Sequence, residues 1–93
     1  MSKFELGTVV CTAAIGDDIT TDKDFAEFVK DSFNNRYILG DWGDLCKEDA
    51  EMNNKAIKNG ERIMGAYKKD GITIWIITEA DRSVTTILYP HEY

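Results

Sequence analysis

The stretch Gly60-Glu-Arg-Ile-Met-Gly-Ala-Tyr-Lys-Lys-Asp-Gly-Ile-Thr-Ile-Trp-Ile-Ile-Thr78 decides the fold. Its centre, Ile72 to Thr78, is rich in β-branched and aromatic residues, which favour a strand. Asp70-Gly71 is a strong hairpin signal, because a two-residue type I′ turn needs a positive φ at both positions. The sequence therefore predicts two antiparallel strands, Arg62 to Lys69 and Ile72 to Thr78, joined by this turn.

The turn also predicts which side chains share a face of the sheet, because side chains alternate along a strand. Counting from the turn pairs Tyr67 with Ile74. If a four-residue turn leads into a third strand, Ser83 to Tyr89, then Ile76 pairs with Thr85. One face, which we expect to be the core face, then carries Ile63, Tyr67, Ile72, Ile74, Ile76, Ile87 and Tyr89.

The opposite face of this sheet is also apolar. It carries Met64, Ala66, Trp75, Ile77, Val84, Thr86 and Leu88. A contiguous apolar surface of this size is seldom left open to water. We therefore expect either a helix of this chain or another chain to cover it. As a candidate interface we take Met64, Trp75, Ile77, Val84 and Leu88.

The N-terminal half predicts one strand and one helix. Phe4 to Thr12 ends in β-forming residues, with Gly7 as a possible bulge. Ala13 to Thr21 is expected to be a polar connector. A helix should begin after Thr20 or Thr21 and run to about Asn35, because one apolar stripe recurs at helical spacing through Phe25, Phe28, Val29 and Phe33.

A second helix is predicted from about Leu45 to Asn59. Asp44 is its expected N-cap, and Gly60 suits the left-handed residue that ends many helices. At 93 residues the chain is long enough for one domain, spanning 1–93. The predicted fold class is α+β, with an antiparallel sheet of three to four strands and two helices in the order β-α-α-β-β-β.

Charge is distributed unevenly along the chain, whose formal net charge is −6. Between Asp17 and Glu51 there are eleven acidic residues and only four basic ones. Such a surface would repel a nucleic-acid backbone, so we expect no direct binding to nucleic acid and favour a protein partner with a basic surface. A merely solvated surface is the alternative. The candidate acidic face is Asp24, Glu27, Asp31, Asp41, Asp44, Glu48 and Asp49.

The two cysteines, Cys11 and Cys46, lie far apart in the chain and form no C-x-x-C motif. We expect both to be reduced and largely buried thiols. The first residues lack the basic head and apolar run of a signal peptide. No stretch approaches the roughly 20 apolar residues that cross a membrane. The expected location is the cytoplasm.

Two polar segments are candidates for binding a ligand or a partner. The loop after Thr78 offers two carboxylates, a guanidinium and a hydroxyl, namely Glu79, Asp81, Arg82 and Ser83. Arg82 suits a phosphate or carboxylate, although such a loop is more often held together by its own ion pairs. Trp42, between Gly40-Asp41 and Gly43, suits stacking on a ligand, although it also suits packing over the second helix.

No recognised catalytic pattern accompanies these segments. The chain has no G-x-S-x-G, P-loop or G-x-G-x-x-G motif, and its single histidine, His91, lies near the C-terminal end of the sequence. The carboxylates from Asp41 to Asp49 do not have the spacing of an EF-hand loop. We therefore predict no catalytic residue, no metal and no cofactor.

The segments Gly-Asp-Trp-Gly-Asp-Leu (40–45) and Ile-Trp-Ile-Ile-Thr-Glu-Ala-Asp-Arg-Ser-Val-Thr-Thr-Ile-Leu (74–88) carry a resemblance to a known family. The chain resembles an uncharacterised family of short bacterial proteins, often associated with plasmids or phages. The resemblance covers the chain from Gly40 onward. Some members are labelled as type I restriction modification subunits. This chain lacks the glycine-rich cofactor loop and the Asn-Pro-Pro-aromatic motif of a methyltransferase, so the resemblance transfers no catalytic residue.

Three functional hypotheses follow from these observations. The first is a small acidic, non-catalytic interaction protein of a mobile element. It would imitate DNA and inhibit a nucleic-acid-binding defence enzyme, as anti-restriction and anti-CRISPR proteins do. The second is a housekeeping module that dimerises through the Trp75 face. The third is a small-molecule binder or enzyme centred on Trp42 and the Glu79–Arg82 loop.

Overall fold

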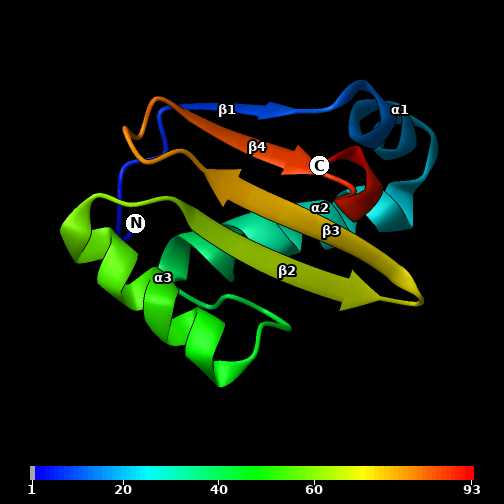
Figure 1. The fold of residues 1–93 in the computed structure, drawn as a ribbon. Coiled ribbons are helices and arrows are strands. Elements are labelled where there is room, and N and C mark those ends of the chain that lie inside the picture. Colours follow the sequence, from blue (N-terminus) through cyan, green and yellow to red (C-terminus); the bar gives the residue numbers. More distant parts are fainter. Residues whose placement is uncertain (1) are drawn as a thin grey trace.

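The computed structural model describes residues 2–93 as an α+β fold with a four-stranded sheet and three α-helices (Figure 1). The strands lie in the order β1-β4-β3-β2, and two short 3₁₀ turns complete the fold. The predicted fold class is confirmed, but the sheet is mixed and there is one more helix than predicted. In chain order the elements are β1 (Thr8–Cys11), α1 (Ala13–Thr21), α2 (Lys23–Asn34), η1 (Tyr37–Leu39), α3 (Lys47–Asn59), β2 (Ile63–Lys69), β3 (Ile72–Thr78), β4 (Val84–Leu88) and η2 (Pro90–Glu92).

The β2–β3 hairpin has the predicted register. Tyr67 pairs with Ile74, and the turn residues Asp70 and Gly71 have φ values of 52° and 80°. The β3–β4 register differs from the prediction by two residues, because Thr78 pairs with Thr85 rather than Ser83. A shift by an even number keeps every side chain on its predicted face. The partition of the two faces therefore survives the error in the register.

Strand β1 pairs with β4 in parallel, so the prediction of a purely antiparallel sheet was wrong. The strand begins at Thr8, later than predicted. Gly7 precedes it with a φ of 63° and lies against the β3–β4 loop, where a Cβ would be 2.3 Å from the carbonyl oxygen of Ser83. Gly7 is thus a point of close backbone approach, which only glycine permits, and not a bulge.

The segment Ala13–Thr21 is the helix α1, where the sequence had predicted a connector. The side chain of Thr12 caps it by accepting the N–H of Ile15 at 3.4 Å, and Ile15 is fully buried. Asp22 ends α1 and also begins α2, because its carboxylate accepts the N–H groups of Asp24 and Phe25. The cap of α2 is therefore Asp22 rather than one of the two preceding threonines.

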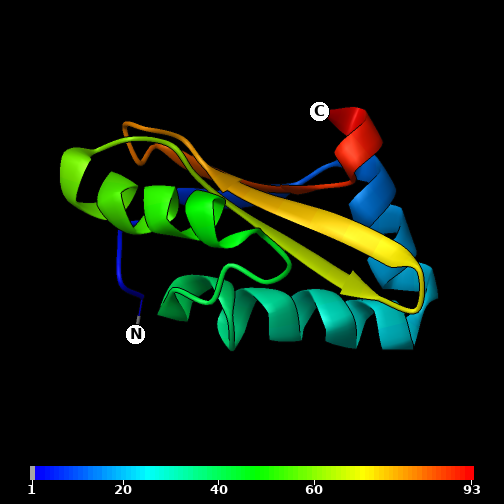
Figure 2. The same cartoon turned by 60° about the horizontal axis from the view of Figure 1, so that its bottom comes forward.

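Helix α2 lies beneath the core face of the sheet, as Figure 2 shows. Its predicted apolar stripe is confirmed, with Phe25, Phe28 and Val29 buried and Phe33 partly buried. These side chains pack with those of α1, η1 and the sheet. The buried cluster consists of Ile15, Phe25, Phe28, Val29, Tyr37, Trp42, Ala56, Ile63, Tyr67, Ile74, Ile76 and Ile87.

Helix α3 lies along the β2 edge of the sheet (Figures 1 and 2). Gly60 ends it in the left-handed conformation, as predicted. Its N-cap is Cys46 and not Asp44, because the N–H of Asp44 donates to the carbonyl of Ala66 in β2 at 2.7 Å. The turn before the helix is thus hydrogen-bonded to the edge strand β2.

The C-terminal turn η2 packs against part of the outer face of the sheet. Ala66, Ile77 and Leu88 are buried there. The ring of Tyr93 meets that of Trp75 edge-on, with centroids 5.6 Å apart. We had expected a helix or a partner chain on this face; the residues that cover part of it in the structure are those of the C-terminal turn.

Both cysteines are exposed, which contradicts the prediction that they would be buried. Cys11 lies on the edge strand β1, and Cys46 lies in the turn before α3. No helix among residues 2–93 is long and apolar enough to cross a membrane.

Candidate functional site

All seven residues of the predicted acidic face are exposed. They form two groups. Asp24, Glu27 and Asp31 follow one side of α2, at positions i, i+3 and i+7. The other group belongs to the turn before α3 and to its first turn, and comprises Asp41, Asp44, Glu48 and Asp49.

Asp41 is the one member of the acidic face that forms an ion pair within residues 2–93. Arg36 Nε donates to Asp41 Oδ2 at 2.9 Å, and the N–H of Gly43 donates to Oδ1 at 3.0 Å. The bond to Arg36 lowers the pKa of Asp41, and the bond from Gly43 lowers it further. The other six carboxylates have no opposite charge within ion-pair distance in the described chain, so they contribute mutual repulsion.

Arg82 holds the β3–β4 loop against the end of α3. Its Nη1 donates to the carbonyls of Glu61, Glu79 and Ala80 at 2.6, 3.2 and 3.3 Å. Its Nη2 donates to the carbonyl of Ala56, in the last turn of α3, at 2.9 Å. A cation beside the carbonyls of the last turn interacts favourably with the helix dipole and so stabilises a helix C-terminus. The guanidinium therefore donates hydrogen bonds to four main-chain carbonyls.

The remaining residues of the two predicted ligand segments also make internal bonds. Asp81 accepts the N–H and the hydroxyl of Ser83 at 3.0 and 2.6 Å, and the hydroxyl bond is the main cause of its lowered pKa. Glu79 lies 3.8 Å from Arg62. Trp42 is buried, with 5% of its surface exposed, and its indole N–H donates to Asn54 of α3 at 3.0 Å. Trp42 thus joins its segment to α3, whereas Asp81 bonds within its own loop and Glu79 pairs with the residue before β2.

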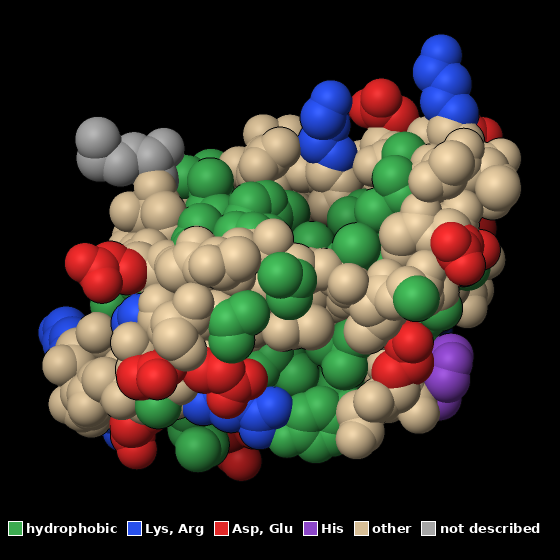
Figure 3. Space-filling view, turned by 90° about the horizontal axis from the view of Figure 1, so that it is seen from above, with side chains coloured by type: hydrophobic (Ala, Val, Ile, Leu, Met, Phe, Trp, Pro, Cys, Tyr) green, Lys and Arg blue, Asp and Glu red, His purple; other side chains and the backbone are tan. Residues whose placement is uncertain are grey.

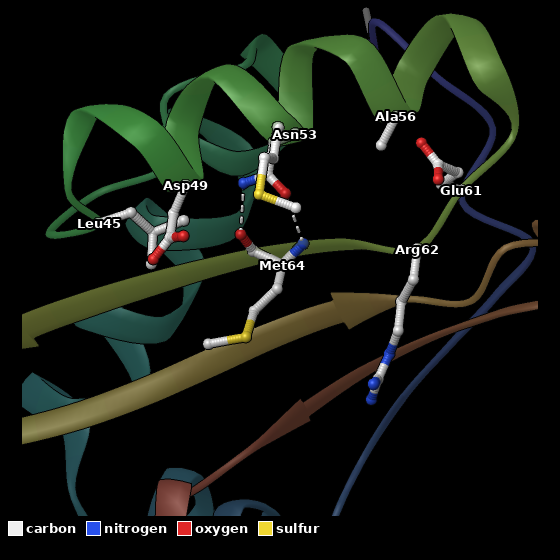
Figure 4. A pocket seen from close by; sticks show the side chains of 8 residues that line it. Leu45, Asp49, Asn53, Ala56, Glu61, Arg62 and Met64 are labelled. Atoms are coloured by element: carbon white, nitrogen blue, oxygen red, sulfur yellow. Dashed lines mark hydrogen bonds between the residues drawn. The ribbon is translucent and has the colours of Figure 1, made fainter.

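A groove of about 480 Å³ separates α3 from β2 (Figure 4). At its centre Asn53 faces the strand and binds the main chain of Met64 twice. Its Nδ2 donates to the Met64 carbonyl at 2.6 Å, and its Oδ1 accepts the Met64 N–H at 3.2 Å. The groove is lined by Leu45, Asp49, Met52, Asn53, Ala56, Glu61, Arg62 and Met64.

The role of Asn53 was not predicted from the sequence. Its signal was available, because Asn53 interrupts the inward stripe of α3 three residues before the buried Ala56. A polar residue on the buried side of a helix needs a partner for its amide. An edge strand, with its unpaired N–H and C=O groups, can supply that partner.

The structure brings the five predicted interface residues together on the outer face. Met64 pairs with Ile77, and Trp75 pairs with Leu88. Val84 lies on the same face at the start of β4, beside Thr8 of β1. Met64, Trp75 and Val84 are partly exposed, whereas Ile77 and Leu88 are buried by their neighbours.

No group of three or more His, Cys, Asp or Glu residues within 2–93 is placed to hold a metal ion. His91 is exposed and stacks on Tyr89 at 5.6 Å between ring centroids. Burial and the neighbouring carboxylate of Asp18 raise the pKa of Tyr89 to about 12, so this hydroxyl stays protonated. Tyr37 and Tyr67 also have raised pKa values because they are buried.

Comparisons with protein-family models, with curated proteins and with solved structures found no match.

Proposed function

We propose that this protein is a non-catalytic interaction protein whose acidic face binds a basic surface on another protein. One observation carries the proposal. Six of the seven carboxylates of that face are exposed and lack an ion pair in residues 2–93. Their mutual repulsion is relieved when a cationic surface approaches, which favours such a partner and speeds its association.

The arrangement of the carboxylates on α2 supports one class of partner. Asp24, Glu27 and Asp31 are separated by about 4.5 and 6 Å along the helix axis. This interval is of the same order as the charge spacing of about 3.4 Å along one DNA strand. The proposed partner is therefore a nucleic-acid-binding enzyme, such as a restriction or CRISPR defence enzyme, whose DNA-binding surface the acidic face occupies.

Competition with DNA tests the proposal. A purified type I restriction enzyme is bound to a fluorescent duplex in about 50 mM salt, and this protein is added to displace the duplex. The triple variant Asp24→Asn/Asp31→Asn/Glu48→Gln should lose about tenfold in apparent affinity, because three ion pairs at about 0.5 kcal/mol each are removed. Raising the salt should weaken the wild type more steeply than the variant.

A control variant removes the same charge from other parts of the chain. Glu5→Gln/Glu61→Gln/Asp81→Asn changes three exposed acids that lie outside the acidic face. It should retain the wild-type affinity to within about twofold. An equal loss in both variants would show that net charge alone is recognised. Failure of the wild type to displace DNA from restriction and CRISPR enzymes would reject the proposed partner class.

A further inference from the structure

The outer edge of β1 is the feature that the proposed function leaves unused. All four residues of this strand are exposed, and Val9 and Val10 expose 44% and 41% of their surface. The strand lies at the end of the sheet, with β4 as its only neighbour among residues 2–93 (Figure 1). It carries no charge, proline or bulge of the kind that usually blocks an edge.

The backbone of β1 presents hydrogen-bonding groups outward. In a parallel pair, alternate residues direct both their N–H and C=O toward the neighbouring strand. Here Thr8 and Thr12 donate to the carbonyls of Ser83 and Ile87 in this way. Val9 and Cys11 are out of phase with them, so their N–H and C=O groups point away from β4. Another strand could bind there by main-chain hydrogen bonds.

An apolar groove of about 290 Å³ lies beside this edge, between β4 and α2. Figure 3 looks onto the edge and shows apolar side chains gathered along the middle of this surface. Val9 and Cys11 pair with Thr85 and Ile87, so their side chains lie on the groove side of the sheet. The groove is lined by Ile19, Ala26, Glu27, Val29, Lys30, Phe33 and Ile87.

We propose that β1 pairs antiparallel with β1 of a second copy, so that the two sheets become one sheet of eight strands. The twofold axis passes between the two Val10 residues. Val9 of each copy then faces Cys11 of the other, and these outward-directed residues exchange N–H···O=C bonds. The side chains of Val9 and Cys11 bring the apolar grooves of the two copies together on one side of the sheet.

The surface around the strand is self-complementary, which a twofold interface requires. The segment Thr8-Val9-Val10-Cys11-Thr12 is uncharged and reads similarly in both directions, so antiparallel pairing opposes no like charges. The groove is bordered by one acid and one base, Glu27 and Lys30, on adjacent turns of α2. Because the two α2 helices run antiparallel across the axis, Glu27 of one copy approaches Lys30 of the other.

Net charge explains why the second copy should meet this edge and not the acidic face. Two molecules of charge −6 repel each other wherever their acidic faces meet. The edge of β1 combines free backbone groups, an adjoining apolar groove and a rim of balanced charge. A second copy can therefore dock there without opposing two acidic surfaces.

Sedimentation velocity of the full chain at about 100 µM tests the proposal. The wild type should sediment as a dimer. Val9→Lys should sediment as a monomer, because it places two like charges close to the axis and beside the grooves. The matched control is Ile72→Lys, which changes a 41% exposed strand residue at the far end of β3 and should remain a dimer. Circular dichroism checks that both variants remain folded.

A charge exchange provides a second test that does not alter the strand. Glu27→Lys should weaken dimerisation about tenfold, because it opposes like charges twice across the axis. The double variant Glu27→Lys/Lys30→Glu should restore the wild-type affinity. A monomeric wild type would overturn the proposal and leave the edge to an extended segment of another protein. A dimer that survives Val9→Lys would also overturn it and would favour the Trp75 face.

Discussion

The two edges of the sheet are treated in opposite ways. On the β2 edge, Asn53 binds both main-chain groups of Met64, and the next outward residue, Ala66, is bound by the turn before α3. The Ala66 N–H donates to the carbonyl of Trp42, and its carbonyl accepts the N–H of Asp44. On the β1 edge, Val9 and Cys11 have no such cover within residues 2–93.

The difference shows how a small sheet can block one edge and leave the other available. Helix α3 and the turn before it bind the main-chain groups of the β2 edge that a fifth strand would otherwise bind. Gly43 even forms a parallel β-bridge to Ala66. The β1 edge is limited only by its length of four residues. Among residues 2–93, the β1 edge therefore has main-chain groups free for strand addition.

Removing the glycine that allows this close approach should have the largest effect on stability. A Cβ on Gly43 would lie 1.9 Å from the carbonyl oxygen of Ala66, and its φ is 76°. Gly43→Ala should lower the free energy of unfolding by about 3 kcal/mol or more, because it combines backbone strain with displacement of the turn. Urea unfolding followed by circular dichroism measures this change.

Gly71→Ala is the control that separates the cost of backbone strain from the cost of a steric clash. Gly71 has a φ of 80°, but a Cβ there would meet no atom within 4 Å. This variant should lose only about 1 kcal/mol, from the left-handed backbone alone. Equal losses for Gly43→Ala and Gly71→Ala would contradict the close packing of the turn against β2.

Truncation of Asn53 should have the second-largest effect. Asn53→Ala leaves the N–H and C=O of Met64 without their side-chain partners at a site where Asn53 itself is only 6% exposed. The expected loss is about 2 kcal/mol in the free energy of unfolding. Hydrogen exchange at the Met64 amide should accelerate with it.

The control for this variant is Asn59→Ala, which changes an exposed residue on the same helix and should cost less than about 0.5 kcal/mol. In a Val9→Lys monomer, the amides of Val9 and Cys11 should exchange rapidly whether Asn53 is present or not. If the Met64 amide of the wild type exchanges as fast as the Val9→Lys monomer exchanges its Cys11 amide, then Asn53 does not bind the β2 edge in solution.

The smallest of the three effects concerns the ion pair that holds the turn beside β2. Arg36 lowers the pKa of Asp41 below its ordinary value of 3.8. The folded state thus binds a proton at Asp41 less readily than the unfolded state, so the stabilisation is present above about pH 4 and is lost as the pH falls through the folded pKa. Both side chains are substantially exposed, at 34% and 51%, which limits the effect to less than about 1 kcal/mol.

Asp41→Asn tests this contribution, because asparagine can still accept the N–H of Gly43 but cannot pair with Arg36. The variant should be less stable than the wild type at pH 7, and the difference should shrink toward pH 3. Adding 1 M NaCl at pH 7 should reduce the difference as well. A difference that is independent of both pH and salt would assign the effect to geometry instead of charge.

The parts of the fold that depend on local chemistry were predictable from the sequence. Asp70-Gly71 specifies a turn of two residues, and the alternation of the flanking strands follows from that turn. The helix α2 was predictable from its apolar stripe, and the exposure of the acidic face from the position of its carboxylates on outer helix surfaces. Each of these sequence patterns lies within or beside the helix or strand that it predicts.

The parts that depend on distant contacts were missed. The β3–β4 loop contains no glycine, yet Arg82 adopts a φ of 61°, in a loop where its guanidinium is bound to carbonyls of α3 and of the residue after Gly60. No pattern in the sequence of either strand indicates that β1 pairs with β4 in parallel. Helix α1 was hidden by Gly16 and two aspartates, although Ile15 and Ile19 have helical spacing.

The pairing of β1 with β4 also determines when the fold can be completed. The side chain of Thr12, at the end of β1, donates to Glu92, 80 positions later. A chain emerging from the ribosome can form α1, α2 and α3 early, but β1 must wait until its partner β4 has been synthesised. Until then the strand Thr8–Cys11 lacks its neighbour β4. The nascent protein is therefore most exposed to mispairing at the same strand that the mature protein leaves open.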